Sequence, residues 1–130
     1  MVKKKFDRRR YIRVGLTSKV RFATSGDYQK PMFNGFGMIK DLSVEGIGFI
    51  TEEKLTPNEY VKLEIFLPEV SKPLLLNGQV RWSVAFDSHD QKKLFDVGVK
   101  LFTLEDNDEG DFVRYVSNKL TDFLGNNIHL

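Results

Sequence analysis

The stretch GFGMIKDLSVEGIGFIT, residues 35–51, decides the fold of this chain. Residues 35–42 and residues 46–51 each have the character of a short strand bounded by turn residues. Between them lies Asp41-Leu42-Ser43-Val44-Glu45-Gly46, which carries the Asp, Ser and Gly typical of a tight connection. The stretch therefore predicts two consecutive strands joined by a turn.

Further strands are predicted on both sides of this pair. Apolar residues at even positions from 14 to 22 indicate one strand before it, and a loop is expected over residues 24–34. Six strands at hairpin spacing, without helices between them, predict an antiparallel sheet that closes or nearly closes into a barrel. The strands expected after the pair are residues 61–67, residues 74–86 with an interruption at Asn77-Gly78, and residues 95–102, which follow a turn at residues 87–90.

The last segment changes to a helical period. Five apolar residues fall on one helical stripe, and the acidic residues before them suit the positive end of a helix dipole. Asp106 or Asp108 is expected to cap the helix, and Gly125-Asn126 to end it. We expect this helix to pack on the barrel; docking to a partner is the alternative. The stripe consists of Phe112, Val116, Leu120, Phe123 and Leu124. The predicted class is thus mainly all-β, a six-stranded antiparallel barrel with a C-terminal α-helix.

Composition limits the class of protein. The 130 residues suffice for one domain with a single core, and the absence of cysteine excludes disulfides and thiolate metal sites. No apolar run approaches the roughly 18 residues of a membrane span, and no secretory signal is visible, so a cytoplasmic location is expected. No catalytic pair, nucleotide-binding glycine loop or metal cluster is recognisable, so we expect neither an enzyme nor a metal protein.

The charge is distributed unevenly along the chain. Residues 1–13 carry seven Lys and Arg against one Asp, whereas the remainder has 13 basic and 17 acidic residues. We therefore expect a basic flexible arm over residues 1–13 and a folded barrel with its helix over residues 14–125. Such an arm points to an anionic partner, which on charge alone is a nucleic acid, an anionic membrane or a phosphorylated small molecule.

Arginines within the arm have the spacing of a binding motif. Arg9 and Arg13 are four residues apart, which keeps them on one side of a helical or an extended segment. A guanidinium forms paired hydrogen bonds with phosphate oxygens or with the O6/N7 edge of guanine. Arg8 and Arg10 flank the first of them. The alternative is a solvated tail, or one that binds nucleic acid loosely.

The turn at residues 41–46 offers complementary chemistry. Asp41 and Ser43 can bind the donor edge of a guanine, and Gly46 permits close approach of the backbone. Alternatively, these three residues simply form a tight strand connection. Trp82 is the single tryptophan, and its ring either forms part of the barrel wall or packs against a guanine.

With these motifs the chain resembles the PilZ domain family, bacterial receptors for the second messenger cyclic di-GMP. Arg9-x-x-x-Arg13 and Asp41-x-Ser43-x-x-Gly46 match the two ligand motifs, while Gly78-x-Val80-x-Trp82 and residues 98–101 resemble two of the family's strands. The resemblance covers about residues 6–124. It implies a six-stranded barrel with a C-terminal helix, and a role in motility or biofilm regulation.

The resemblance also implies roles for single residues. Arg9 and Arg13 would contact phosphates and guanine edges, Asp41 and Ser43 would bind a guanine, and Gly46 would allow the close approach. A basic residue before the arginine motif is associated with an intercalated pair of ligands. Because Arg8 stands there, two cyclic di-GMP molecules per chain are expected, with Arg8 and Arg10 stacking on or pairing with guanines.

These expectations combine into one mechanism. Mutual repulsion should keep the arm mobile until the ligand pulls it onto the barrel, and the signal would pass to an unidentified downstream protein. The alternative is a PilZ-like or OB-like barrel that contacts proteins or nucleic acids without cyclic di-GMP. The acidic body weighs against a nucleic-acid groove.

Overall fold

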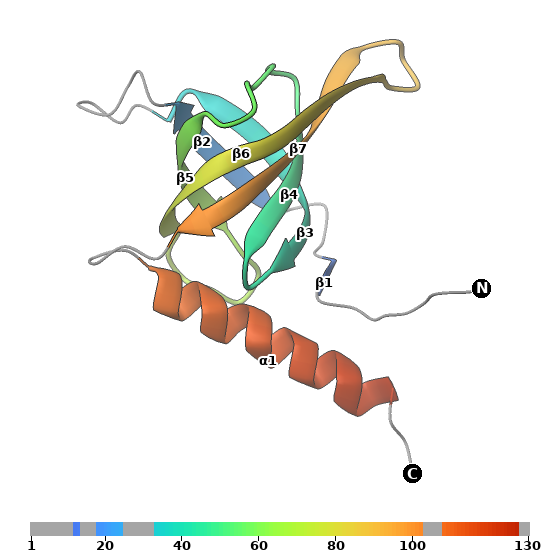
Figure 1. Ribbon diagram of the computed structural model, residues 1–130. Coiled ribbons are helices and arrows are strands. Elements are labelled where there is room, and N and C mark those ends of the chain that lie inside the picture. Colours follow the sequence, from blue (N-terminus) through green and yellow to red (C-terminus); the bar gives the residue numbers. More distant parts are fainter. Residues whose placement is uncertain (1–11, 14–17, 25–32, 103–107, 128–130) are drawn as a thin grey trace.

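The computed structural model describes residues 12–13, 18–24, 33–102 and 108–127, which form seven strands and one helix (Figure 1). The strands are β1 (Ile12–Arg13), β2 (Lys19–Thr24), β3 (Gly35–Ser43), β4 (Gly46–Thr51), β5 (Tyr60–Phe66), β6 (Leu74–Asp87) and β7 (Lys93–Phe102). Helix α1 spans Glu109–Asn127.

Strands β2 to β7 form a closed antiparallel barrel. Around the barrel the order is β3-β2-β5-β6-β7-β4, and the pairing of β3 with β4 closes the ring. The predicted six-stranded barrel with a C-terminal helix is confirmed. The two-residue strand β1 was not predicted; it adds to β3 outside the ring, with Ile12 opposite Leu42 and Arg13 opposite Asp41. Of the strand predicted around residues 14–22, the described part is β2.

The core fills the barrel with the residues that the alternation placed inside. In β5, Val61, Leu63 and Ile65 are buried while the residues between them are partly exposed. Two large core rings, Phe22 of β2 and Phe49 of β4, meet with their centroids 5.5 Å apart. Along β5, one face therefore lines the interior, and period-two patterning is satisfied.

Strand β6 departs from the prediction at Asn77-Gly78, where no interruption occurs. The strand continues through Gly78, which is needed for a close contact rather than for a turn: a Cβ there would lie 2.4 Å from the side chain of Val99. A β-bulge follows between Val80 and Trp82. Beyond the bulge, the ends of β6 and β7 project from the barrel as a hairpin (Figure 1).

Helix α1 packs against one end of the barrel (Figure 1). Phe112 and Val116 are buried and join the barrel core, which agrees with the predicted packing. Asp108 precedes the helix as predicted, and its carbonyl accepts the first helical hydrogen bond, from Phe112 N–H at 2.9 Å. Its carboxylate, however, accepts a hydrogen bond from Leu75 N–H of β6 at 2.8 Å, so it anchors the helix to the barrel.

The helix does not end at Gly125-Asn126 as predicted, but one residue later at Asn127. The other cap candidate, Asp106, lies outside the described residues. In the described part of the chain, no helix has the length together with the apolar character needed to cross a membrane.

Candidate ligand-binding site

One row of cross-strand neighbours crosses the outer face of the barrel. Arg13 of β1 lies opposite Asp41 of β3, Asp41 opposite Gly48 of β4, Gly48 opposite Gly98 of β7, and Gly98 opposite Trp82 of β6. Antiparallel pairing therefore places the end of the arginine motif, the aspartate of the second motif and the single tryptophan in one line across five strands.

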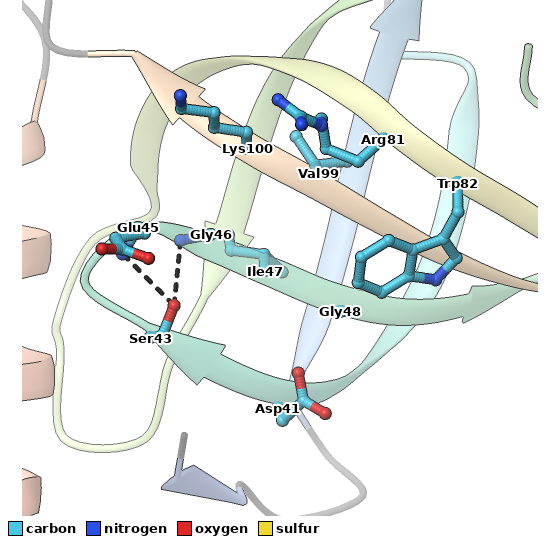
Figure 2. Close-up of a pocket in the computed structure, with 10 residues that line it drawn as sticks. All are labelled: Asp41, Ser43, Glu45, Gly46, Ile47, Gly48, Arg81, Trp82, Val99 and Lys100. Atoms are coloured by element: carbon cyan, nitrogen blue, oxygen red, sulfur yellow. Dashed lines mark hydrogen bonds between the residues drawn. The ribbon is translucent and has the colours of Figure 1, made fainter. Parts of the chain in front are cut away.

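Two glycines in the middle of this row leave room for the side chains on either side. A Cβ on Gly48 would lie 2.6 Å from Oδ1 of Asp41, and a Cβ on Gly98 would lie 2.3 Å from the indole of Trp82. The carboxylate thus lies over β4 and the indole over β7. Figure 2 shows both side chains directed toward the same surface between them. Glycine is needed here for close approach rather than for backbone freedom.

Trp82 faces outward because of the bulge in β6. Simple alternation after the buried Val80 would turn Trp82 inward. Because the bulge adds Arg81 as an extra residue, Trp82 points outward instead. The indole is 48% exposed, and its Nε1–H lies 3.5 Å from Oδ1 of Asp96. Trp82 therefore lies on the outer face, beside the second motif, and its packing against a guanine stays a prediction.

Ser43 and Gly46 hold the hairpin between β3 and β4 together. The Ser43 Oγ accepts hydrogen bonds from the backbone N–H groups of Glu45 at 3.2 Å and of Gly46 at 3.1 Å (Figure 2). Gly46 does not have a positive φ, and a Cβ on it would lie 2.5 Å from the carbonyl oxygen of Val99. Both residues therefore have a structural role, while the Ser43 hydroxyl proton remains available as a donor.

The side chains of this region line a pocket of about 410 Å³. It carries both signs of charge, from Asp41 and Glu45 on one side and from Arg81 and Lys100 on the other. Among the described residues, neither of these two cations forms an ion pair or side-chain hydrogen bond. Acceptors, cations and an exposed indole around one pocket suit a polar ligand with anionic groups and a flat ring. The lining residues are Asp41, Ser43, Glu45, Gly46, Ile47, Gly48, Arg81, Trp82, Val99 and Lys100.

The structure describes some of the predicted site residues and not others. It brings Asp41, Ser43, Gly46 and Trp82 to this pocket, and it places the backbone of Arg13 beside Asp41. Arg8, Arg9 and Arg10 lie outside the described residues. No group of three or more His, Asp or Glu that would suit a metal ion occurs among the residues described.

Several residues of this pocket region were not predicted from the sequence, among them two glycines and two cations. Gly48 and Gly98 were not recognised as site residues because their role depends on which strands lie side by side. Arg81 and Lys100 were missed because they lie within the two patterns, residues 78–82 and 98–101, that were taken to report strands of the barrel rather than the site. One signal was present: Arg81 directly precedes the only tryptophan, so a cation stood next to an aromatic side chain in the sequence.

Comparison with protein families gives a match to the PilZ domain over residues 7–118. This span includes both ligand motifs, the whole barrel and the first part of α1. Among curated proteins, no sequence matches this chain.

Several solved structures share the fold. MrkH of K. pneumonia, in its apo state, superimposes with a TM-score of 0.66 at 16% identity, covering 95% of this chain and 53% of MrkH. The Bacillus subtilis inhibitor of motility MotI/DgrA gives 0.58 at 17%, covering 92% of this chain and 54% of that protein. This chain thus spans about half the length of either.

The PilZ domain of YcgR from Escherichia coli, in a structure with c-di-GMP, is nearly coextensive with this chain. It gives a TM-score of 0.54 at 12% identity, with 92% of this chain and 98% of that domain covered. At these identities the likeness establishes the shared fold.

Proposed function

The chain belongs to the PilZ domain family, and from this premise we propose that it is a receptor for cyclic di-GMP. The YcgR PilZ domain, which has the same extent and fold, holds this ligand. The observation that carries the proposal to this chain is the register: Arg13 lies opposite Asp41, in the row that ends at Trp82. Cyclic di-GMP needs cations for two phosphates, acceptors for guanine donors and a flat surface, and this row supplies all three chemistries.

We propose a role for each motif residue. The Arg9 and Arg13 guanidiniums bind phosphate oxygens and the O6/N7 edges of guanine. Asp41, held over Gly48, accepts hydrogen bonds from the N1–H and N2–H₂ edge of a guanine. Ser43 donates its hydroxyl proton, since its oxygen already accepts two backbone N–H groups, and Gly46 lets the ligand approach the hairpin.

The half-exposed indole of Trp82 packs against a guanine at the other end of the row. Arg8 and Arg10 stack on or pair with guanines of an intercalated ligand pair, so the saturated complex holds two cyclic di-GMP molecules per chain. Stacking of Arg on flat rings suits this role, because the guanidinium is itself planar and charged.

Ligand binding orders the N-terminal arm. Residues 1–13 carry seven positive charges that repel one another, and the phosphates neutralise part of this charge. We propose that the arm, residues 1–13, folds onto the barrel and helix unit of residues 14–125, starting from Ile12 and Arg13, which already pair with β3, and that a downstream protein recognises the new surface. The chain then acts as an adaptor rather than as an enzyme.

Calorimetric titration with cyclic di-GMP tests the receptor proposal, with GTP and a single-stranded oligonucleotide as competing ligands. Arg9→Ala and Asp41→Ala are each expected to weaken binding by roughly 10- to 100-fold, because each loses hydrogen bonds to a charged group. Arg114→Ala is the matched control: this arginine lies on α1, does not line the pocket, and among the described residues forms an ion pair only with Asp111. Equal affinity for the oligonucleotide, or no heat with cyclic di-GMP, would contradict the proposal.

The same titration tests the stoichiometry, and amide exchange tests the arm. We expect an endpoint of two ligands per chain, reduced to one in Arg8→Ala. Exchange at residues 3–13 should slow when the ligand is added. An endpoint of one in the unaltered chain removes the ligand pair, and unchanged exchange removes the ordering of the arm, while the receptor proposal stands in either case.

A further inference from the structure

The outer part of β6 has a free edge. β5 pairs with β6 only as far as Tyr60 opposite Gln79, and the last backbone hydrogen bonds on that side are made at Val80. From Arg81 to Asp87, the described strands provide β6 with one neighbour, β7. Within the described part of the chain, the backbone groups on the other side of this segment have no strand partner. We call residues 81–87 the β6 edge.

The composition of the β6 edge is unusual for a strand exposed in this way. Its middle is Trp-Ser-Val-Ala-Phe, residues 82–86, without a charged residue or proline. Trp82, Val84 and Phe86 alternate along it and are 48%, 57% and 39% exposed. Free edges of monomeric proteins are normally protected by lysine, proline or a short strand, and an apolar edge of this kind pairs with another strand.

The sequence of the β6 edge is complementary to itself. When two copies are placed antiparallel with Val84 opposite Val84, Trp82 of each falls opposite Phe86 of the other. In the same register, Arg81 falls opposite Asp87, so opposite charges meet at both ends. Aromatic pairs and opposite charges are the favourable cross-strand combinations. A two-fold axis between the two Val84 residues produces each of the other pairs twice.

From this complementarity we propose that the chain forms a symmetric dimer through antiparallel pairing of two β6 edges. The two-fold axis passes between the two Val84 residues. The occupant of the edge is a second copy of this chain. The hairpin that carries the edge projects from the barrel, which leaves the approach open on the described part of the molecule (Figure 1). The paired segment is short, so the interface is small and the expected dissociation constant is roughly 10–100 µM.

A single introduced cysteine tests the register directly, because the chain has none of its own. Residues opposite one another in antiparallel strands have Cα atoms about 4.5–5.5 Å apart, within the roughly 4.4–6.8 Å that a disulfide spans. The full-length Val84→Cys variant should therefore form a covalent dimer rapidly under mild oxidation. Val113→Cys, on the exposed face of α1 and 41% exposed, is the matched control and should crosslink far more slowly.

Sedimentation velocity over a range of protein concentrations measures the unmodified assembly. The unaltered chain should pass from monomer to dimer near the expected concentration. Val84→Lys places two like charges at the axis and should weaken the dimer at least about tenfold. Arg81→Asp and Asp87→Arg should each weaken it, whereas the double exchange should restore it. Unchanged thermal melting of each variant verifies its fold.

Two results would overturn the proposal. One is a chain that stays monomeric at several hundred micromolar and whose two cysteine variants crosslink equally slowly. The other is a dimer that Val84→Lys leaves intact, which would locate the interface elsewhere. Neither measurement involves cyclic di-GMP, so the outcome is independent of the receptor proposal.

Discussion

Replacing Gly98 by alanine should displace Trp82 and leave the other proposed ligand-binding residues in place. The added Cβ would lie 2.3 Å from two atoms of the indole and 2.5 Å from a third, far inside van der Waals contact. The indole is 48% exposed and lies on the outer face, so it can swing away instead of forcing the strands apart. We therefore expect local loss of packing and an intact barrel.

The cost follows from the surface that the indole covers. A tryptophan of which half is buried hides about 100 Å² of mostly apolar area, which at about 25 cal/mol per Å² corresponds to about 2.5 kcal/mol. The displaced ring keeps part of this contact. Gly98→Ala should therefore lower the free energy of unfolding by about 1–2 kcal/mol.

Urea unfolding followed by fluorescence reports both consequences, because Trp82 is the only tryptophan. The midpoint should fall, and the emission maximum of the folded variant should move to longer wavelength as the indole enters solvent. In a Trp82→Ala background, followed by circular dichroism, the same glycine replacement should change the unfolding free energy by less than about 0.5 kcal/mol, because the clash has no partner.

Gly110→Ala provides the control, since a Cβ at this helical position meets nothing within 4 Å. It should leave the unfolding free energy unchanged or raise it by up to about 1 kcal/mol, because alanine is the better helix former. The reasoning fails if Gly98→Ala unfolds at the same urea concentration as the unaltered chain with the same emission. It fails equally if Gly98→Ala lowers the free energy of unfolding by the same amount in the Trp82→Ala background.

Three further predictions concern other contacts. Gly46→Ala puts a Cβ 2.5 Å from the backbone oxygen of Val99, which cannot swing away. Thermal denaturation should therefore show that the free energy of unfolding falls by about 1–3 kcal/mol. Asp108→Ala leaves the N–H of Leu75 without its acceptor and should cost about 0.5–1.5 kcal/mol in urea, whereas Asp108→Asn, which keeps an oxygen, should cost less. Burial raises the pKa of Tyr115, so folding favours its neutral form. The contribution of Tyr115 to folding stability is complete below the pKa of tyrosine in the unfolded chain, about 10, and is lost as the pH rises through the pKa of Tyr115 in the folded chain. Tyr115→Phe should therefore flatten the alkaline part of a stability profile measured between about pH 8 and 11.

Local patterning explains why most of the fold was predictable. Alternation in residues 61–67 reports which side of the strand faces the core, and this depends only on neighbours in the sequence. It failed at Asn77-Gly78, where turn-forming residues run through a continuous strand. Gly78 is there because the side chain of Val99 lies against it, and a contact across two strands leaves no local trace.

The candidate site was predictable only in its motifs. Asp41 and Ser43 were identified from their spacing, and both line the pocket. The link to Trp82 was left open, because the indole direction depends on a bulge that inserts Arg81 into the β6–β7 pairing. Alternation alone turns the ring inward, while the register with β7 turns it outward.

The sequence by itself determined the strands, the helix, the uneven charge and the two ligand motifs, because each depends on residues only a few positions apart. The tertiary structure decided which of these features meet. Barrel closure places β3, β4, β7 and β6 side by side, so residues 41 and 82, far apart in the sequence, share one surface across Gly48 and Gly98. It also decided where pairing stops and leaves the β6 edge exposed, since a strand edge is defined only by the neighbours that it lacks.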